Sequence, residues 1–147
     1  MPLSIVLADD DPEFRMIVRY LLASVSEDMA LVGEAADGAE ALALVLREQP
    51  DVLVTDLVMP RLDGIELTRR VREAWPDTKI ILMSSYTDDA YRMMASSSGA
   101  DAFVNKQVIH SSLVSAIRDL TGRRLSSGSG PCPGSAGTSS SPAAPPN

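Results

Sequence analysis

Cysteine and histidine, the side chains that most often bind soft metal ions, are almost absent from this 147-residue chain. The only cysteine is Cys132 and the only histidine is His110. One cysteine cannot form an internal disulfide, and one residue of each kind cannot supply a thiolate or imidazole site. The sequence therefore excludes a disulfide scaffold and a cysteine-based metal centre.

Long apolar runs and an excess of basic residues are also missing. No run approaches the roughly 18 apolar residues of a membrane-spanning helix, and no basic segment precedes the first run as in a secretory signal. Residues 1–122 hold all 20 acidic residues but only 11 of the 13 basic ones. Because binding to a phosphate backbone needs a basic surface, this domain is not expected to bind nucleic acid. We expect a cytoplasmic protein without membrane contact.

Large apolar residues nearly disappear after residue 122, where serine, glycine, proline and alanine take over. A segment of this composition buries too little apolar surface to offset the entropy lost on ordering. We predict one domain over residues 1–122 and a disordered tail or linker over residues 123–147.

Four short apolar runs each lead into polar side chains. Ile5–Ala8 precedes Asp9 and Asp10, Val52–Thr55 precedes Asp56, Ile80–Met83 precedes Ser84, and Ala102–Asn105 precedes Lys106. Runs of this length, separated by segments with helical periodicity, predict strands of a parallel sheet covered on both faces. A further short strand is expected near Leu31-Val32.

A helix is expected after each strand. The first begins at Asp11-Pro12, the second follows Asp37-Gly38, Asp63 and Asp88 cap the third and fourth, and the last runs from about Ser111 to Leu120 before Gly122. One stripe of the first helix is apolar and comprises Phe14, Ile17, Val18, Leu21, Leu22 and Val25. This alternation predicts an α/β fold, a three-layer doubly wound (βα)5 flavodoxin-like sandwich whose five parallel strands run in the order 2-1-3-4-5.

Ligand chemistry in such sheets gathers at the carboxyl ends of the strands, so Asp9, Asp10 and Asp56 are expected to face one another. Carboxylates this close repel, and a hard divalent cation with oxygen ligands, Mg²⁺ or its substitute Mn²⁺, removes the repulsion. A carboxylate beside such a cation and a lysine can attack a phosphoryl group. Lys106 supplies the ammonium group, and Ser84 supplies a hydroxyl for the phosphate.

Each of these residues alone also has an ordinary structural interpretation. Asp9 or Asp10 can be a helix-start acid, Asp56 can cap a loop, Ser84 can simply end a strand, and Lys106 can be solvated. Their positions at the ends of four separate strands favour a shared site.

Four stretches together resemble the receiver domain of two-component response regulators. They are Leu7–Pro12, Thr55–Gly64, Met83–Ser85 and Gly99–Lys106, within a resemblance that covers about residues 3–121. The Asp-x-x-Met-Pro-x-x-Asp-Gly pattern that begins at Asp56 is highly specific. The resemblance is strongest to receivers that precede a helix-turn-helix output domain.

The resemblance implies a role for each matched residue. Asp56 would accept a phosphoryl group from a sensor histidine kinase or a phosphotransfer protein. Asp10 and Asp56 would ligate Mg²⁺ together with the backbone carbonyl of Val58, and Asp9 would act mainly through a metal-bound water.

Further matched residues would carry the signal. Ser84 and Lys106 would contact the phosphate, and Phe103 matches the family's aromatic switch. Output would use the face formed by the fourth helix, the last strand and the last helix.

Two positions depart from the family pattern. Gln107 stands where a proline often follows the lysine, which leaves the geometry of that loop open. Ser84 replaces the commoner threonine and keeps its hydroxyl.

Val58 and Tyr86 flank the expected phosphate, and we expect them to slow its hydrolysis.

Two other functions compete with this interpretation. A Mg²⁺-dependent phosphohydrolase would form an aspartyl-phosphate on the first strand, with Asp9 as nucleophile and Asp11 as acid. A phosphate-independent interaction domain would only share the fold. The leading hypothesis is a signalling switch, not an enzyme with a separate substrate, that catalyses only its own phosphotransfer and dephosphorylation. A phosphorylation-dependent homodimer and a DNA-binding output domain beyond residue 147 remain open.

Overall fold

The computed structural model describes residues 2–25, 28–85, 93 and 97–122. Its strands are β1 (Leu3–Ala8), β2 (Met29–Ala35), β3 (Val52–Asp56), β4 (Lys79–Ser84) and β5 (Ala102–Asn105). They form one five-stranded sheet in the order β2-β1-β3-β4-β5, and every neighbouring pair is parallel. The predicted fold class and strand order are confirmed.

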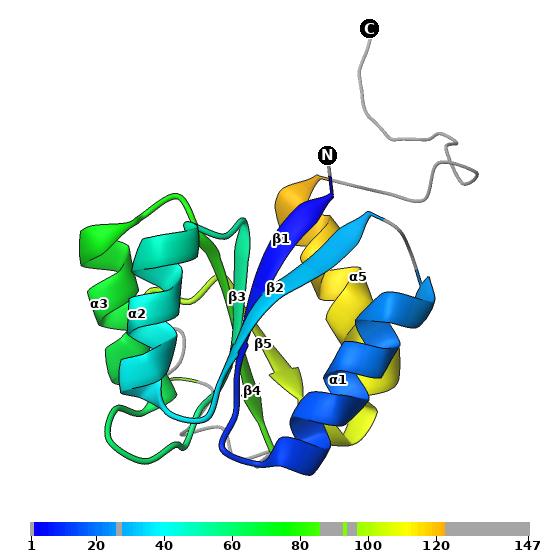
Figure 1. The fold of residues 1–147 in the computed structure, drawn as a ribbon, viewed down its shortest axis with the longest axis horizontal. Helices are drawn as coiled ribbons and strands as arrows, with labels where there is room; N and C mark the ends of the chain where they lie inside the picture. Colours follow the sequence, from blue (N-terminus) through cyan, green and yellow to red (C-terminus); the bar gives the residue numbers. More distant parts are fainter. Residues whose placement is uncertain (1, 26–27, 86–92, 94–96, 123–147) are drawn as a thin grey trace, which may run out of the picture.

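The helices of the described part cover both faces of this sheet. They are α1 (Pro12–Val25), α2 (Gly38–Glu48), α3 (Gly64–Ala74) and α5 (Ile109–Thr121), with a 3₁₀ turn, η1 (Lys106–Val108), before α5. Figure 1 shows α1 and α5 on one face of the sheet and α2 and α3 on the other. The arrangement is the expected three-layer sandwich.

The central strands are buried on both faces. In β1, Ile5 and Leu7 pack in the apolar cluster shared with α1 and α5, whereas Val6 and Ala8 pack in the cluster shared with α2 and α3. None of these four side chains is exposed to solvent. A strand in this position is a continuous apolar run, because neither face meets water.

Carboxylates cap the N-termini of α2 and α3; the cap at Asp63 was predicted, and α2 follows Asp37 as expected. The Oδ1 atom of Asp37 accepts a hydrogen bond from the backbone N–H three residues later at 2.8 Å, and Oδ1 of Asp63 does the same at 2.9 Å. Each cap satisfies a backbone donor that has no partner within the helix. Gly122 ends α5 with a φ of 76°, a left-handed conformation that glycine adopts at little cost.

The structure differs in detail from three expectations about element boundaries and packing. β2 is longer than expected because it lies at the sheet edge, where its inner positions are only partly buried and the apolar signal is weak. α5 begins at Ile109, two residues before Ser111, because η1 already turns the chain after β5. Ile17 is 48% exposed, since it lies beside the buried line of Val18 and Leu22 rather than on it. The predicted cap at Asp88, the tail at 123–147 and the side chain of Val25 lie outside what the structure describes.

Within the described residues, no helix has the length and apolar character needed to cross a membrane.

The start of α3 lies directly against the end of β3, and Gly64 permits this contact. A Cβ atom added at Gly64 would stand 2.3 Å from the backbone oxygen of Asp56 and 3.0 Å from the Cα atom of Leu57. The N–H of Gly64 also donates to the carbonyl of Leu57 at 2.8 Å. The backbone that carries Asp56 is therefore fixed by a contact that only glycine allows.

Replacing Gly64 with alanine is expected to destabilise the domain by about 2 kcal/mol, because the added methyl group forces two backbone segments apart. Urea denaturation measures the loss. Gly33→Ala is the matched control, because its Cβ would meet only the flexible side chain of Leu44, at 3.1 Å. Equal losses in the two variants would contradict the proposed contact.

Candidate functional site

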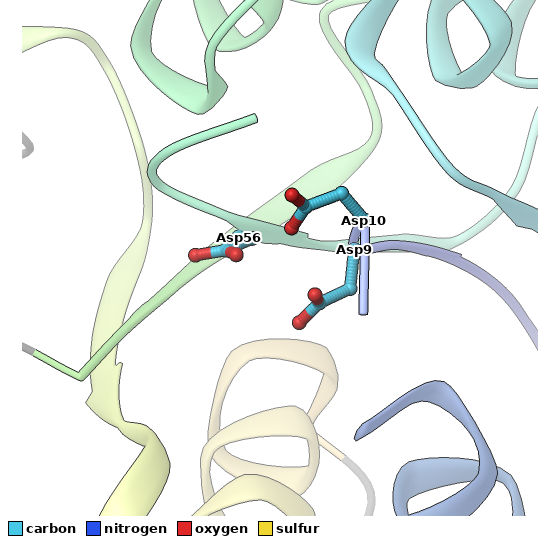
Figure 2. Close-up of side chains that lie close together, drawn as sticks. All are labelled: Asp9, Asp10 and Asp56. Atoms are coloured by element: carbon cyan, nitrogen blue, oxygen red, sulfur yellow. The ribbon is translucent and has the colours of Figure 1, made fainter. Parts of the chain in front are cut away.

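Three carboxylates meet at the carboxyl ends of β1 and β3. The two strands are neighbours, with Ala8 opposite Thr55 in the register, so the residues that follow them emerge side by side. One carboxylate oxygen each from Asp9, Asp10 and Asp56 lies within 4.8 Å of the others (Figure 2). The predicted convergence of these side chains is confirmed as geometry.

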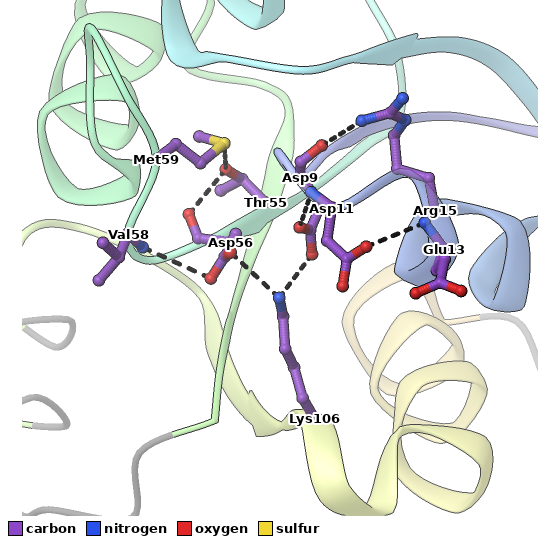
Figure 3. Close-up of polar contacts among 9 residues, drawn as sticks. All are labelled: Asp9, Asp11, Glu13, Arg15, Thr55, Asp56, Val58, Met59 and Lys106. Atoms are coloured by element: carbon purple, nitrogen blue, oxygen red, sulfur yellow. Dashed lines mark hydrogen bonds and ion pairs between the residues drawn. The ribbon is translucent and has the colours of Figure 1, made fainter.

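The ammonium group of Lys106 lies between two of these carboxylates. Its Nζ atom is 2.6 Å from Oδ2 of Asp9 and 3.0 Å from Oδ2 of Asp56 (Figure 3). Asp9 is fully buried, and the side chains of Asp56 and Lys106 are each 13% exposed. Lys106 directly follows the edge strand β5, so its long side chain connects that edge to the ends of β1 and β3.

Burial and charge act in opposite directions at this site. Desolvation raises the pKa of Asp56 above its ordinary value and is only partly offset by the charge of Lys106, while the nearby Asp9 raises it further. Burial acts to lower the pKa of Lys106, but hydrogen bonding and charge attraction from Asp9 and Asp56 together outweigh it, and the pKa lies above its usual value. The lysine is therefore held as a cation beside an excess of negative charge.

Ser84 and Phe103 lie on the two strands beyond β3. Ser84 ends β4, is 1% exposed, and stands one residue past Met83, which pairs with Asp56 in the register. Phe103 on β5 is partly buried and packs against Leu57 and Leu82. The fold thus places the hydroxyl on the strand next to Asp56 and the aromatic ring one strand further away.

The loop after β3 is described up to the start of α3. The N–H of Val58 donates to Oδ1 of Asp56 at 3.4 Å, and Val58 is 52% exposed. Tyr86, the other residue expected to flank the phosphate, lies outside the described residues. The roles predicted for both residues stay predictions.

The departure at Gln107 has a structural consequence. Its backbone N–H donates to Oδ1 of Asn105 at 2.8 Å and begins η1. A proline at this position has no N–H to donate. The loop that carries Lys106 is therefore fixed by a hydrogen bond that the commoner family residue cannot make.

Two residues of α1 contact the site, although the sequence did not predict these contacts. The ring of Phe14, expected only as a core residue, has its centroid 4.4 Å from Nζ of Lys106, a cation–π distance. Arg15 donates from Nη1 to the backbone carbonyl of Asp9 at 2.6 Å. The sequence signals only that both residues lie on the first helix, not which way they point.

The ligand atoms suit a hard divalent cation. All three acidic side chains offer carboxylate oxygens, and no described histidine or cysteine joins them. Among the described residues, the polar partner of the buried Oδ2 atom of Asp9 is the ammonium group of Lys106. Mg²⁺ accepts such oxygen ligands and keeps several waters. The residues therefore fit the expected cation.

Without a divalent cation, Lys106→Met is expected to destabilise the domain by about 2 kcal/mol at neutral pH, because two largely buried carboxylates lose their counter-charge. This loss of stability is smaller than the loss expected for a fully buried ion pair, because the Asp56 side chain is partly solvated. Thermal unfolding in a chelator measures it.

The deficit depends on pH in a defined direction. The Asp56 pKa, already raised, rises further when Lys106 is removed. Protonated Asp56 is tolerated in both proteins, so this part of the deficit is absent at acid pH. It develops as the pH rises from the raised Asp56 pKa of the parent to the still higher pKa of the variant. Lys79→Met, at an exposed site, is the control. A deficit that is constant with pH would contradict the charge argument.

Comparison with known proteins agrees with the geometry. A family model, the response regulator receiver domain, matches residues 5–118. The oxygen regulatory protein NreC of Staphylococcus carnosus is 38% identical over 119 residues, which cover 80% of this chain and 54% of that protein. The chain spans about half the length of the curated relatives it matches.

Solved structures show the same similarity. The signal receiver domain of NarL from Mycobacterium tuberculosis superposes with a TM-score of 0.78 at 34% identity and covers 84% of this chain and 98% of that one. The isolated receiver domain of RcsB from Salmonella enterica serovar Typhimurium, solved with the phosphomimetic BeF₃⁻, gives a TM-score of 0.76 at 25% identity, covering 90% of this chain and 94% of that one. With this fold, these strand-end acids and this family match, the chain belongs to the response regulator receiver domains of two-component signalling.

Proposed function

We propose that this domain is a phosphorylation-dependent switch and that Asp56 is its phosphoacceptor. The observation that carries the proposal is the contact of the Asp56 carboxylate with Lys106 at 3.0 Å, beside the acids of the β1–α1 loop. Asp56 is largely buried, but 13% of its side chain remains exposed at the strand end, where a phosphoryl donor is expected to reach it. Asp9 is fully buried and paired with Lys106, which argues against a nucleophile on the first strand.

The transfer step follows from the chemistry of the donor. One oxygen of Asp56 attacks the phosphorus of a phosphohistidine, so that an O–P bond forms as the P–N bond breaks. The electron pair returns to the imidazole nitrogen, which takes up a proton. Lys106 is already held beside Asp56 and pairs with the phosphoryl oxygens as they approach. The protein acts once on itself and needs no separate substrate.

Metal ligands for this step are assigned to the acidic cluster. Asp10, Asp56 and the backbone carbonyl of Val58 would hold Mg²⁺, with Mn²⁺ as a substitute, and Asp9 would contact it mainly through water. When bound, the cation neutralises the carboxylates and the oxygens of the transferred group.

Ser84 and Phe103 are expected to change position when the phosphate is added. Ser84 ends the strand next to Asp56, so its hydroxyl can turn to a phosphate oxygen. Phe103 lies on β5, opposite Leu82 of β4 and packed against it, so a movement of the neighbouring Ser84 is expected to change the space open to its ring. The output face then includes β5 and α5, together with the segment before β5.

The partners are inferred from the family match and from the names of the relatives. We infer a sensor histidine kinase or phosphotransfer protein as the donor and the cytoplasm as the location of this domain. Transcription control is the inferred outcome, because the matched relatives are named transcriptional regulatory proteins. The chain spans about half of those relatives, so a DNA-binding output domain beyond residue 147, and a homodimer formed on phosphorylation, belong to the same proposal.

Phosphorylation of Asp56 is tested with a small acyl phosphate and Mg²⁺. The intact protein is expected to gain the mass of one phosphoryl group, and site mapping should place it on Asp56. Asp56→Asn, which keeps the size of the side chain, should gain none. Modification of the Asp56→Asn protein to the same extent, or mapping to Asp9, would contradict the proposal.

The lifetime of the phosphate is expected to depend on Val58. An apolar side chain beside the acyl phosphate gives an attacking water no hydrogen-bond partner, whereas asparagine offers one. Val58→Asn combined with Tyr86→Ala should therefore hydrolyse several times faster than the parent in a phosphate-release assay. Val58→Leu is the control and should hydrolyse at the parent rate. A double variant no faster than the parent would rule out this role.

A further inference from the structure

The peptide bond between Asp9 and Asp10 is held from outside the acidic cluster. Arg15, one turn into α1, donates from Nη1 to the carbonyl of Asp9 at 2.6 Å (Figure 3). Its Nε atom also lies 3.4 Å from Oε1 of Glu34 on β2, and its side chain is only 20% exposed. The guanidinium group therefore joins the loop after β1 to the neighbouring strand.

Glu34 is itself fixed. It pairs with Leu7 in the β1–β2 register, and its carboxylate accepts two hydrogen bonds from Arg19, at 2.7 Å from Nε and 3.0 Å from Nη2. The hydrogen bond from Arg19 is the main reason that the pKa of Glu34 lies below its ordinary value. Arg15 is thus anchored to a carboxylate that stays charged and in place.

Asp10 depends on this anchoring more than its neighbours do. Asp9 is held by a hydrogen bond from its own N–H to the carbonyl of Ala35 at 3.0 Å, and by the N–H of Asp11, which donates to its Oδ1 at 2.9 Å. The exposed side chain of Asp10 makes no hydrogen bond or ion pair in the described structure. Its position follows from the orientation of the preceding peptide, whose carbonyl Arg15 holds.

We propose that Arg15 is a positioning residue that orients Asp10 for the divalent cation, through the Asp9 carbonyl. The inference rests on the proposed function, since it assumes that Asp10 is a metal ligand. Residues that orient metal ligands without touching the ion commonly change metal affinity by about 10–100-fold when removed.

Positioning and simple electrostatics predict opposite results. Removing a positive charge near a cation site should strengthen cation binding if charge alone matters. If Arg15 acts by orienting Asp10, its removal should weaken binding in spite of the charge change. The sign of the effect therefore separates the two explanations.

The test measures Mn²⁺ affinity by electron paramagnetic resonance of the free ion, well below the unfolding temperature. Arg15→Met should bind Mn²⁺ about tenfold more weakly than the parent. Arg47→Met is the control, because it removes an exposed positive charge from α2 and its described ion pair is with Glu48, not with the loop or with Glu34. Its affinity should stay near that of the parent or increase. Arg15→Lys should recover part of the lost affinity.

Equal or tighter binding by Arg15→Met would overturn the inference. If Arg15→Met does not fold, Arg15→Lys and Glu34→Gln replace it in the test, because each weakens the contact between Arg15 and Glu34. Unchanged Mn²⁺ affinity in both variants would overturn the inference. Loss of binding in Asp10→Asn with full binding in Arg15→Met would contradict only the role of Arg15. A parent protein that does not bind Mn²⁺ would contradict the metal site itself and the proposed function with it.

Discussion

One ammonium group balances two buried carboxylates in this fold, and the arrangement of the site depends on it. Lys106 comes from the sheet edge and reaches the acids of two central strands at 2.6 and 3.0 Å. Desolvation alone would make such acids protonate, and their repulsion adds to that cost. The lysine keeps the acidic cluster assembled, and it leaves an excess of negative charge that suits a divalent cation and an incoming phosphoryl group.

The main parts of the fold and the site can be predicted because parallel topology leaves little choice. Strands that alternate with helices must end at the same edge of the sheet, so polar residues that directly follow apolar runs converge there. Asp9, Asp56 and Lys106 were identified by that rule alone. The acidic caps at Asp37 and Asp63 were equally predictable, because the capping hydrogen bond is local in sequence.

Contacts that depend on the rotation of a helix could not be predicted. Phe14 and Ile17 seemed equivalent on the apolar stripe of α1, yet Phe14 turns its ring to Lys106 while Ile17 is half exposed. The hydrogen bond from Arg15 to the Asp9 carbonyl has no signature, since any arginine on that helix could have faced solvent. The length of β2 was also underestimated, because an edge strand has a weak apolar pattern.

Nuclear magnetic resonance of the side chains during a Mg²⁺ titration tests the shared site most directly. The carboxyl carbons of Asp10 and Asp56 and the Nζ atom of Lys106 should all shift with one common midpoint, because one cation would alter the charge that all three groups share. Shifts with different midpoints, or shifts confined to acids elsewhere on the surface, would contradict a single site built from the ends of β1, β3 and β5.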